Sequence, residues 1–393
     1  EYFSPYLCSL NIDIMAVYLD NAATTPIAPE VIEAMLPVLR DGYGNPSSTH
    51  SFGRKSKAIL ETSRRSVAKH INATPSEIIF TSGGTEADNI AINSAVFTMG
   101  VKRIITSTLE HHAVGHTAEA VTKQFGAHVE YVNVDNKGNV DLNHLETLLQ
   151  NDVKTMVSLM HANNEIATLL PLKKVSALCR KYDALFHSDT VQTMGHYVFD
   201  MQDLDIDYLT CSAHKIHGPK GIGFLYVKSN VRIEPLMHGG SQERGFRGGT
   251  ENIYGIVGLA KAMDLAYEDL EGHQKHIQGL KTHLMNEFAA YFSDVQFHGE
   301  TSPDKSLYTV INVCFPITEK SSMLLFTLDL KGIAVSGGSA CTSGASIGSH
   351  VLRGINADMT RPNARFSFSR YTTMEEIDYA VEQVKAVYEK TLA

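Results

Sequence analysis

Short β-rich runs that alternate with helical segments constrain the fold of this chain more than any other feature of its sequence. Polar or helix-compatible stretches separate most of these runs. The runs cover residues 78–81, 103–107, 129–134, 155–160, 184–188, 208–212 and 223–227. Repeated alternation of strand and helix is typical of a mainly parallel sheet with helices on both faces. We therefore predict an α/β protein whose large domain is built on a mainly parallel seven-stranded sheet.

The sequence pattern changes near residue 260. A long helical pattern covers about residues 253–292, and strand-like runs follow at 309–315, 332–335 and 365–369. A final helical pattern then carries a single apolar stripe, as expected for a helix packed on a core. These elements predict a second, smaller α/β domain at the C-terminus.

The predicted division of the chain has four parts. The large domain would cover residues 28–260 and the small domain residues 261–393. Residues 15–27 would form an N-terminal segment that packs near the small domain. Residues 1–14 precede Met15, and we interpret them as an upstream extension or an expression remnant.

Composition and charge exclude several classes of protein. The 393 residues are 43% hydrophobic, enough for a sizeable core, and 34 basic against 43 acidic residues give a net charge of −9. This balance argues against a general nucleic-acid-binding surface, and no run approaches the roughly 18 consecutive apolar residues of a membrane span. The five cysteines are widely spaced without a C-x-x-C pair, which favours a reducing compartment. We expect a cytoplasmic protein with no direct nucleic-acid or membrane partner.

A glycine-rich turn follows the first predicted strand of the sheet. It reads Thr-Ser-Gly-Gly-Thr-Glu over residues 81–86, and a helical pattern begins directly after it. Backbone N–H groups at the start of a helix bind phosphate well, so Gly84 and Thr85 would contribute to a phosphate cradle. An ordinary strand–helix turn with Thr85 as N-cap explains the same residues equally well. The turn matches neither the P-loop nor the dinucleotide-binding pattern, so both of those sites are disfavoured.

Two further candidates follow later strands. Asp189 lies where a strand should end, at the edge where open α/β sheets bind ligands, and its carboxylate can hold a protonated ring nitrogen. A helix N-cap is the alternative role for this aspartate. Lys215 directly follows an apolar strand, where a partly desolvated lysine can form a Schiff base, and Lys220 in the next turn competes for that role. His214 and His217 lack a third ligand at zinc-like spacing, so we predict no metal site.

Cys341 differs from the other cysteines in its surroundings. Most cysteines of a reducing compartment are small buried hydrophobes, and the apolar settings of Cys179, Cys211 and Cys314 fit that role. Cys341 instead lies in a run of Gly, Ser, Ala and Thr, which cannot bury a thiol well. We expect this run to belong to a mobile loop, about residues 336–350. An exposed thiol on such a loop is a candidate nucleophile that moves toward a site.

A phosphate cradle, an aspartate for a ring nitrogen and a Schiff-base lysine are together what pyridoxal phosphate requires. A series of motifs runs through residues 16–391 in one order. They are YLDNAATTP (18–26), GNPSSTHSFG (44–53), TSGGTEADN (81–89), EHHAV (110–114), HANNEIAT (161–168), HSDTVQTMG (187–195), SAHKIHGPKG (212–221), GGSQERGFRGGTEN (239–252), GSACTSGAS (338–346) and ARFSFSRYT (364–372). With these motifs the chain closely resembles the cysteine desulfurases of the NifS/IscS type, which are class V aminotransferase-like enzymes. The resemblance implies the fold-type I architecture of pyridoxal-phosphate-dependent transferases.

The resemblance also implies roles for residues around the cofactor. Lys215 would bind the cofactor covalently, and His111, rather than its neighbour His112, would stack on the ring and assist proton transfers. Asp189 would pair with the ring nitrogen, and Gln192 would reach the phenolic oxygen.

Other implied roles concern the phosphate, the substrate and a second subunit. Thr85, Ser212 and His214 would hold the phosphate together with the backbone around Gly84. Thr250 would contact the phosphate of the other subunit, so that a homodimer completes each site. Asn163 and Arg365 would bind the substrate carboxylate, and Asn163 would also lie close to the phenolic oxygen.

The implied activity is the conversion of L-cysteine to L-alanine, with the sulfur left on Cys341 as a persulfide. The sulfur acceptor would be a scaffold protein for iron–sulfur cluster assembly or a relay protein for tRNA thiolation. The residues after Cys341 match the longer-loop group of these enzymes. The alternatives are a selenocysteine lyase or another class V aminotransferase, and, outside enzymes, a sulfur-relay module with a vestigial cofactor site.

Overall fold

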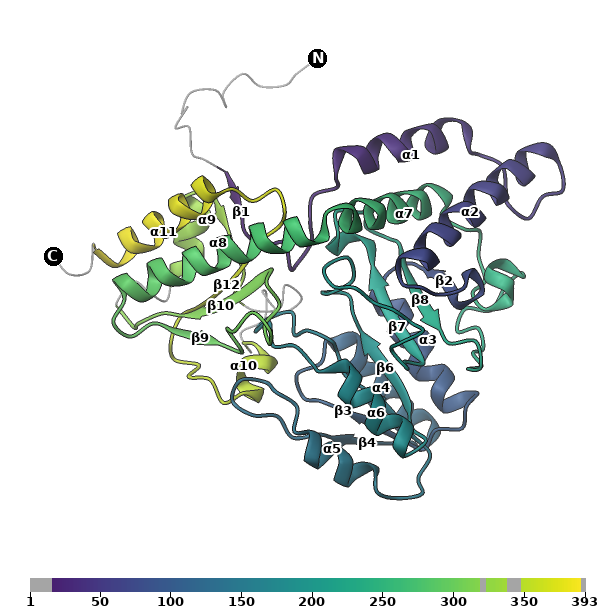
Figure 1. Ribbon diagram of the computed structural model, residues 1–393, viewed down its shortest axis with the longest axis horizontal. Helices are drawn as coiled ribbons and strands as arrows, with labels where there is room; N and C mark the ends of the chain where they lie inside the picture. Colours follow the sequence, from purple (N-terminus) through teal and green to yellow (C-terminus); the bar gives the residue numbers. More distant parts are fainter. Residues whose placement is uncertain (1–15, 319–322, 338–347, 390–393) are drawn as a thin grey trace, which may run out of the picture.

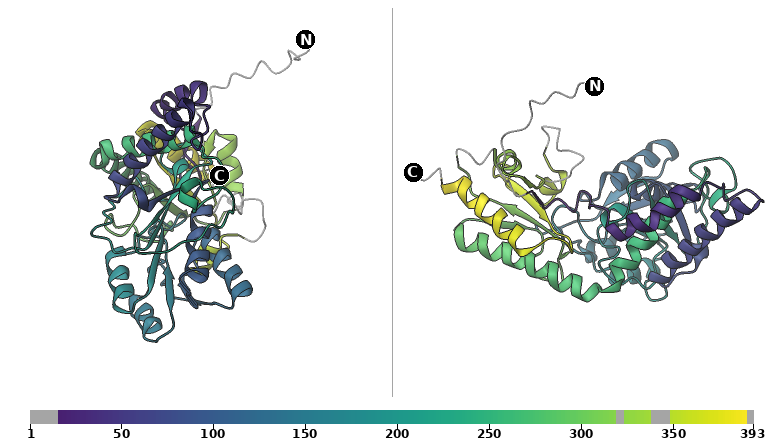
Figure 2. Two further views of the ribbon diagram at one scale, coloured as in Figure 1. Left: turned by 90° about the vertical axis from the view of Figure 1, so that its right-hand side faces the viewer. Right: turned by 90° about the horizontal axis from the view of Figure 1, so that it is seen from above.

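The computed structural model describes residues 16–318, 323–337 and 348–389. Figure 1 shows a larger α/β unit and a smaller one beside it, and the view from above in Figure 2 separates the two. Two long helices, α7 (Ile253–Glu268) and α8 (Leu270–Tyr291), follow one another from the larger unit to the smaller one (Figure 1).

The larger unit is built on a seven-stranded sheet, which confirms the predicted fold class. Its strand order is β2-β8-β7-β6-β5-β3-β4. The strands are β2 (Ile78–Thr81), β3 (Arg103–Thr106), β4 (His128–Tyr131), β5 (Thr155–Ser158), β6 (Leu185–Asp189), β7 (Tyr208–Ser212) and β8 (Gly223–Val227). Strand β8 is antiparallel to both β2 and β7, whereas the other pairs are parallel.

Helices cover both faces of this sheet. Successive side chains of a strand point to opposite faces, and the strands carry apolar side chains on both. In β2, Ile79 joins one buried apolar cluster, and Ile78 and Phe80 join another. The Ile79 face is covered by α3 (Gly84–Phe97) and α4 (His112–Phe125). The opposite face is covered by α2 (Ser51–His70), α5 (Leu142–Leu149), α6 (Leu172–Lys181) and α7, and α1 (Pro29–Asp41) packs on α7.

The smaller unit has a core of its own. Strand β10 (Val310–Cys314) pairs antiparallel with β12 (Asn363–Ser367) and with β9 (Gln296–His298). The helices α8, α9 (Leu324–Leu330) and α11 (Met374–Glu389) bury their apolar side chains in this core, and α10 (His350–Gly354) lies nearer the larger unit. The N-terminal strand β1 (Val17–Tyr18) pairs in parallel with β11 (Ile333–Ala334), so the chain begins its described course on the smaller unit.

The helical pattern over residues 253–292 forms two helices rather than one. The chain breaks at Asp269, whose carboxylate accepts a hydrogen bond from the Gly272 amide and caps α8. Side chains of α7 such as Met263 belong to the core of the large sheet, whereas those of α8 such as Leu284 belong to the core of the smaller unit. We therefore propose that the domain boundary lies at Asp269, because residue 260 is inside α7.

The structure also bears on the cysteines and on membrane-spanning helices. Cys179, Cys211 and Cys314 are buried free thiols, and burial raises the pKa of each, which fits a packing role. Within the described ranges, no helix combines the length and the apolar character that crossing a bilayer would need.

Candidate active site

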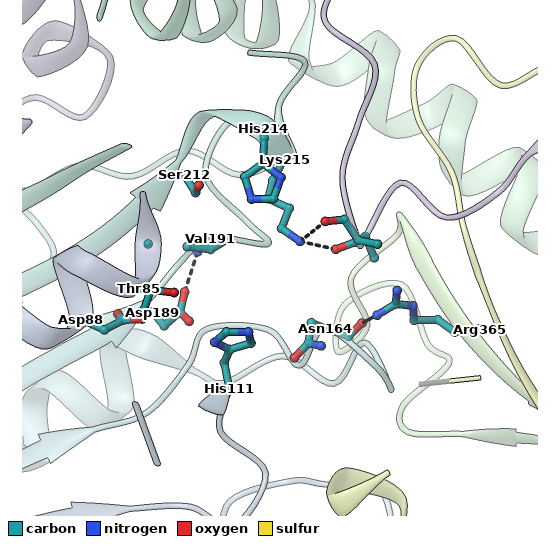
Figure 3. Close-up of a pocket in the computed structure, with 13 residues that line it drawn as sticks. Thr85, Asp88, His111, Asn164, Asp189, Val191, Ser212, His214, Lys215 and Arg365 are labelled. Atoms are coloured by element: carbon teal, nitrogen blue, oxygen red, sulfur yellow. Dashed lines mark hydrogen bonds between the residues drawn. The ribbon is translucent and has the colours of Figure 1, made fainter. Parts of the chain in front are cut away.

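A cavity of about 240 Å³ lies outside the carboxyl ends of the parallel strands, where open α/β sheets bind ligands (Figure 3). Residues that end or follow five strands of the large sheet reach it, together with residues after β1 and one from β12. The lining residues are Ala22, Ala23, Gly84, Thr85, Asp88, His111, Asn164, Asp189, Val191, Ser212, His214, Lys215 and Arg365. Most of the residues predicted for the cofactor and substrate therefore share one cavity, although they are spread along the sequence from Gly84 to Arg365.

The glycine-rich turn places the start of α3 at the cavity wall. The N-cap residue Gly83 adopts a φ of +152°, which favours glycine, and no side chain caps the helix. A Cβ on Gly84 would lie 2.7 Å from Cγ2 of Val191, so only glycine fits the backbone so close to this side chain. Thr85 lies inside the first turn of α3, and the N-cap is Gly83 instead. The uncapped start of α3 suits an anion.

Asp189 ends strand β6 at the floor of the cavity. It is 6% exposed, and its Oδ1 accepts a hydrogen bond from the Val191 amide at 2.9 Å. Burial raises the pKa of Asp189 to about 6, and the nearby acidic group of Asp88 adds to the rise. A cationic group in the cavity would reverse this effect, because opposite charge favours the ionised carboxylate.

Asp88 and His187 form a buried pair close to Asp189 that the sequence did not indicate. His187 Nε2 lies 3.3 Å from Asp88 Oδ1, and its Nδ1 contacts Ser158 Oγ at 2.8 Å. Burial raises the pKa of Asp88 to about 8 and lowers that of His187 to about 4. Both shifts favour the uncharged forms, a protonated Asp88 and a neutral His187. Asp88 therefore adds a second carboxyl group to the cavity wall.

Lys215 belongs to a single 3-10 turn, Ala213–Lys215, directly after β7. Its Nζ donates hydrogen bonds to the carbonyl oxygens of Ala22 at 2.5 Å and Ala23 at 2.8 Å. Lys220 is exposed and does not line the cavity, so the structure brings Lys215 and not Lys220 to the site.

The neighbours of Lys215 also have defined partners. His214 Nδ1 lies 3.1 Å from Thr24 Oγ1, and burial lowers the pKa of His214 to about 4, so its ring is neutral. Ser212 lines the cavity at the end of β7. His217 points away, with Nδ1 2.9 Å from the carbonyl oxygen of Pro26. The described residues contain no group of three or more side chains that could hold a metal ion.

His111 is both the N-cap of α4 and a wall of the cavity. Its Nδ1 accepts a hydrogen bond from the Ala113 amide at 3.2 Å, so the ring proton is assigned to Nε2. Burial lowers the pKa of His111, against the opposing effect of Asp189, and keeps the ring neutral. The neighbouring His112 ring instead stacks on His116, with ring centroids 4.7 Å apart.

The prediction for Asn163 needs a correction. Its Oδ1 accepts hydrogen bonds from the amides of Glu165 and Ile166, and its Nδ2 donates to the carbonyl oxygen of Leu109. The second N–H of Nδ2 points to Met160 Sδ at 3.5 Å. The side chain is 4% exposed and its polar groups hold its own loop, so it has no group left for a substrate. The next residue, Asn164, lines the cavity in its place.

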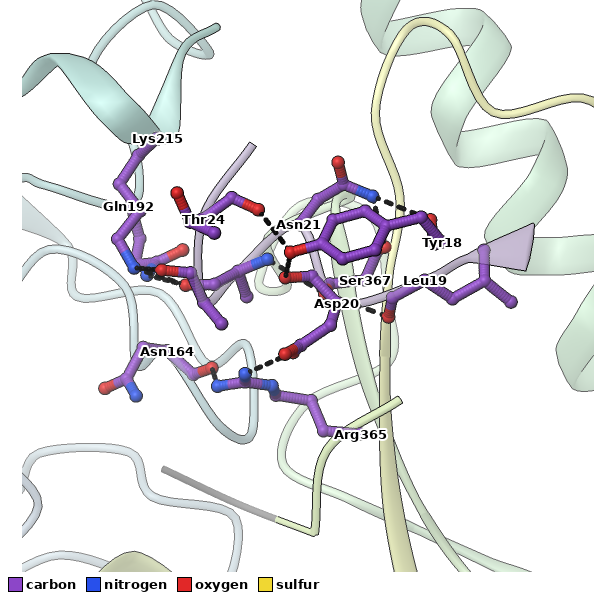
Figure 4. Close-up of polar contacts among 12 residues, drawn as sticks. Tyr18, Leu19, Asp20, Asn21, Thr24, Asn164, Gln192, Lys215, Arg365 and Ser367 are labelled. Atoms are coloured by element: carbon purple, nitrogen blue, oxygen red, sulfur yellow. Dashed lines mark hydrogen bonds and ion pairs between the residues drawn. The ribbon is translucent and has the colours of Figure 1, made fainter. Parts of the chain in front are cut away.

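Arg365 reaches the cavity from strand β12 of the smaller unit (Figure 4). Its Nη2 donates to Asp20 Oδ1 at 2.8 Å, and its Nη1 donates to the carbonyl oxygen of Asn164 at 2.9 Å. Arg365 thus lies where a substrate carboxylate would meet a cation.

Gln192 lies near the segment that contacts Lys215. Its Nε2 donates a hydrogen bond to the carbonyl oxygen of Ala22 at 3.0 Å.

Thr250 lies away from this cavity. Thr250 is exposed, and Arg247 near it forms an ion pair with Glu86 of α3, with Nε 2.8 Å from Oε1. Thr250 therefore has no contact with the site of its own chain. Cys341 lies outside the described residues.

The donor set fits pyridoxal phosphate. The uncapped start of α3, Thr85, Ser212 and neutral His214 suit the phosphate, and the buried carboxylate of Asp189 suits a protonated ring nitrogen. Lys215 supplies the amine for covalent attachment. A site of this kind on a mainly parallel α/β sheet defines a pyridoxal-phosphate-dependent enzyme.

Comparison with known proteins specifies the family. The model of the family described as Aminotransferase class-V matches residues 17–380. This chain therefore belongs to the aminotransferase class-V family.

The relatives are cysteine desulfurases. The chain is 43% identical to "Cysteine desulfurase IscS" of Dictyoglomus turgidum over 378 residues, which cover 95% of each chain. It is 41% identical to "Cysteine desulfurase IscS" of Methanosarcina thermophila, over 95% of this chain and 92% of the relative. Among solved structures, a "NIFS-like protein" superposes with a TM-score of 0.88 at 37% identity, covering 96% of this chain and 100% of that chain.

Proposed function

We propose that this chain is a cysteine desulfurase, which converts L-cysteine to L-alanine and leaves the sulfur on Cys341 as a persulfide. The observation that carries the proposal is the single cavity shared by Lys215, Asp189, His111 and Arg365. The relatives named cysteine desulfurases support the same activity over nearly the whole chain. They do not favour a selenocysteine lyase, another aminotransferase activity or a vestigial site.

Pyridoxal phosphate, when bound, supplies an electron sink for the reaction at Cα of the substrate. Gly84, Thr85, Ser212 and His214 would hold its phosphate. Asp189 would keep the ring nitrogen protonated, and Gln192 would approach the phenolic oxygen.

The side chains of the cavity then divide the work. Arg365 binds the carboxylate of L-cysteine as a charge-assisted pair. Lys215 removes the proton from Cα through Nζ, because it is the amine of the cavity wall. The ring of His111 does not compete as a base, since its Nδ1 lone pair accepts the Ala113 amide and its Nε2 already carries the ring proton. His111 Nε2–H donates to groups that gain negative charge.

The sulfur step belongs to Cys341. Its thiolate attacks the sulfur of the substrate, a sulfur–sulfur bond forms, and the bond between Cβ and sulfur breaks. The electron pair of the broken bond goes to Cβ, which takes up a proton. Lys215 returns a proton to Cα, and alanine leaves. The persulfide then passes its sulfur to an iron–sulfur scaffold or a sulfur-relay protein.

The working unit in this proposal is a homodimer. The exposed position of Thr250, away from the site of its own chain, supports a contact with the phosphate site of the other subunit. The buried free thiols of the described cysteines support a reducing compartment such as the cytoplasm.

Mass spectrometry tests the proposed function directly. The holoenzyme with L-cysteine and no reductant should form L-alanine and gain one sulfur atom on the peptide that contains Cys341. Alanine without a persulfide, or no alanine from a fully loaded enzyme, would contradict the proposal.

A further inference from the structure

Arg365 is almost completely enclosed, yet its polar groups are only partly satisfied. The side chain is 1% exposed, and its Nε has no hydrogen-bond partner among the described residues. Nη1 and Nη2 each donate one hydrogen bond, to the Asn164 carbonyl oxygen and to Asp20 Oδ1. Since each terminal nitrogen carries two N–H groups, one remains on each for a carboxylate. The guanidinium is therefore prepared for one more anionic partner.

Asp20 forms an ion pair with Arg365. The two side chains lie 2.8 Å apart, with 1% of the arginine and 20% of the aspartate side chain exposed. A buried guanidinium without a carboxylate would bear an uncompensated desolvation cost. Asp20 thus compensates the charge of Arg365 before any substrate arrives.

The backbone around Asp20 is tied to the same strand that carries Arg365. The amide of Ala22 donates to Ser367 Oγ at 2.9 Å, and Asn21 Nδ2 donates to the carbonyl oxygen of Ser367 at 2.9 Å. Asp20 itself accepts the Ala23 amide through its carbonyl oxygen at 3.0 Å. Because these contacts hold the segment in place, Asp20 does not have to leave when a substrate binds.

The same segment also sets the position of Lys215. Figure 4 shows residues 18–24 between Lys215 on one side and Arg365 on the other. The carbonyl oxygens of Ala22 and Ala23 hold the amine, and the carboxylate of Asp20 holds the guanidinium. One short stretch of backbone therefore determines the spacing between the two cations of the cavity.

We propose that Asp20 is a positioning residue for substrate recognition, which holds the Arg365 guanidinium so that its remaining N–H groups receive the carboxylate of an α-amino acid. This inference rests on the proposed function for the identity of the amino acid. A competing possibility, in which Asp20 occupies the substrate's place and inhibits binding, predicts the opposite change in affinity.

The test compares holoenzyme of the wild type with the Asp20→Asn variant. Loss of the charge-assisted contact should raise KM for L-cysteine about tenfold, with kcat within about twofold of wild type. The Kd for L-alanine, measured by calorimetry, should rise by the same factor. The Kd for ethylamine, which has no carboxylate, should not change. An unchanged or lower KM and Kd would overturn the proposal.

Two further variants keep the result interpretable. Asp294 forms an ion pair with Arg361 at 3.0 Å, away from the cavity and with its own side chain 66% exposed. Asp294→Asn therefore controls for the loss of one carboxylate paired to an arginine and should leave KM unchanged. Asp20→Glu keeps the charge but displaces it by one methylene, so it should also raise KM even if Asp20→Asn does not fold. If wild type forms no alanine from L-cysteine, the proposed function fails, whereas the comparison of L-alanine with ethylamine still decides the role of Asp20.

Discussion

His111 Nδ1 accepts a hydrogen bond from the backbone amide of Ala113 at 3.2 Å, so one ring both caps helix α4 and faces the cavity. Asparagine is a good N-cap but cannot transfer protons as imidazole does. We therefore expect His111→Asn to lower kcat by about 100-fold while the thermal midpoint stays within about 2 °C of wild type. Steady-state kinetics and calorimetry of one preparation check both values. A variant with wild-type kcat would show that His111 has only a structural role.

The two glycines Gly84 and Gly115 provide a matched pair for the phosphate cradle. A Cβ on Gly84 would approach Val191 Cγ2 to 2.7 Å, whereas a Cβ on Gly115 would meet nothing within 4 Å. We expect Gly84→Ala to weaken cofactor binding at least about tenfold, because the start of α3 must shift. Gly115→Ala, in the interior of α4, should bind the cofactor normally and be up to about 1 kcal/mol more stable. Equal cofactor affinity in both variants, measured by equilibrium dialysis, would contradict the cradle.

Asn163 and Asn164 should respond differently to alanine substitution. Asn163→Ala removes three hydrogen bonds of a buried side chain and should lower the free energy of unfolding by about 2–4 kcal/mol. Asn164→Ala should change stability by less than about 0.5 kcal/mol but lower kcat/KM about tenfold. Chemical denaturation measures the free energy of unfolding of the two variants, and steady-state kinetics measures their kcat/KM. The reverse pattern would restore Asn163 as the substrate ligand.

Lys281 predicts a dependence of stability on pH. Its Nζ donates to Ser306 Oγ at 2.7 Å and to the Leu307 carbonyl oxygen at 2.9 Å, and burial lowers its pKa to about 7 from an ordinary 10.5. Between these pH values the unfolded chain binds more protons at this lysine than the folded protein does. The free energy of unfolding should therefore rise with pH, by at most about 1.4 kcal/mol per unit from this group.

Urea denaturation between pH 7.5 and 9.5 measures this effect. Lys281→Met should lose the rise, whereas Lys275→Met, which replaces an exposed lysine of the same helix, should keep it. Parallel pH profiles for wild type and Lys281→Met would show that this lysine does not titrate in that range.

Much of the sheet was predictable because its strands are short, apolar and flanked by turns. The predicted runs over 78–81, 208–212 and 223–227 coincide with β2, β7 and β8. Strand β9 (Gln296–His298) was missed, since three partly exposed residues give no usable alternation. The break at Asp269 interrupts a continuous helical pattern, and only the N-cap preference of aspartate could have indicated it.

The site was predictable where a residue type and its place after a strand both point to one chemistry. Lys215 and Asp189 satisfy that condition, and the cavity contains both. The choice between Asn163 and Asn164 was not predictable. The two residues are neighbours in one loop, and only the course of that loop decides which side chain faces the cavity. The contact between Asp20 and Arg365 joins residues 345 apart in sequence, and no local pattern in either segment encodes it.

The most direct test of the account is a parallel assay of wild type and Cys341→Ala, each loaded with pyridoxal phosphate and given L-cysteine and a reductant. Alanine and sulfide are measured together. The account predicts equimolar alanine and sulfide from wild type and neither from Cys341→Ala, although L-alanine should still bind the variant. Equal production of alanine by both proteins would show that Cys341 is not the nucleophile and would contradict the proposed desulfurase mechanism.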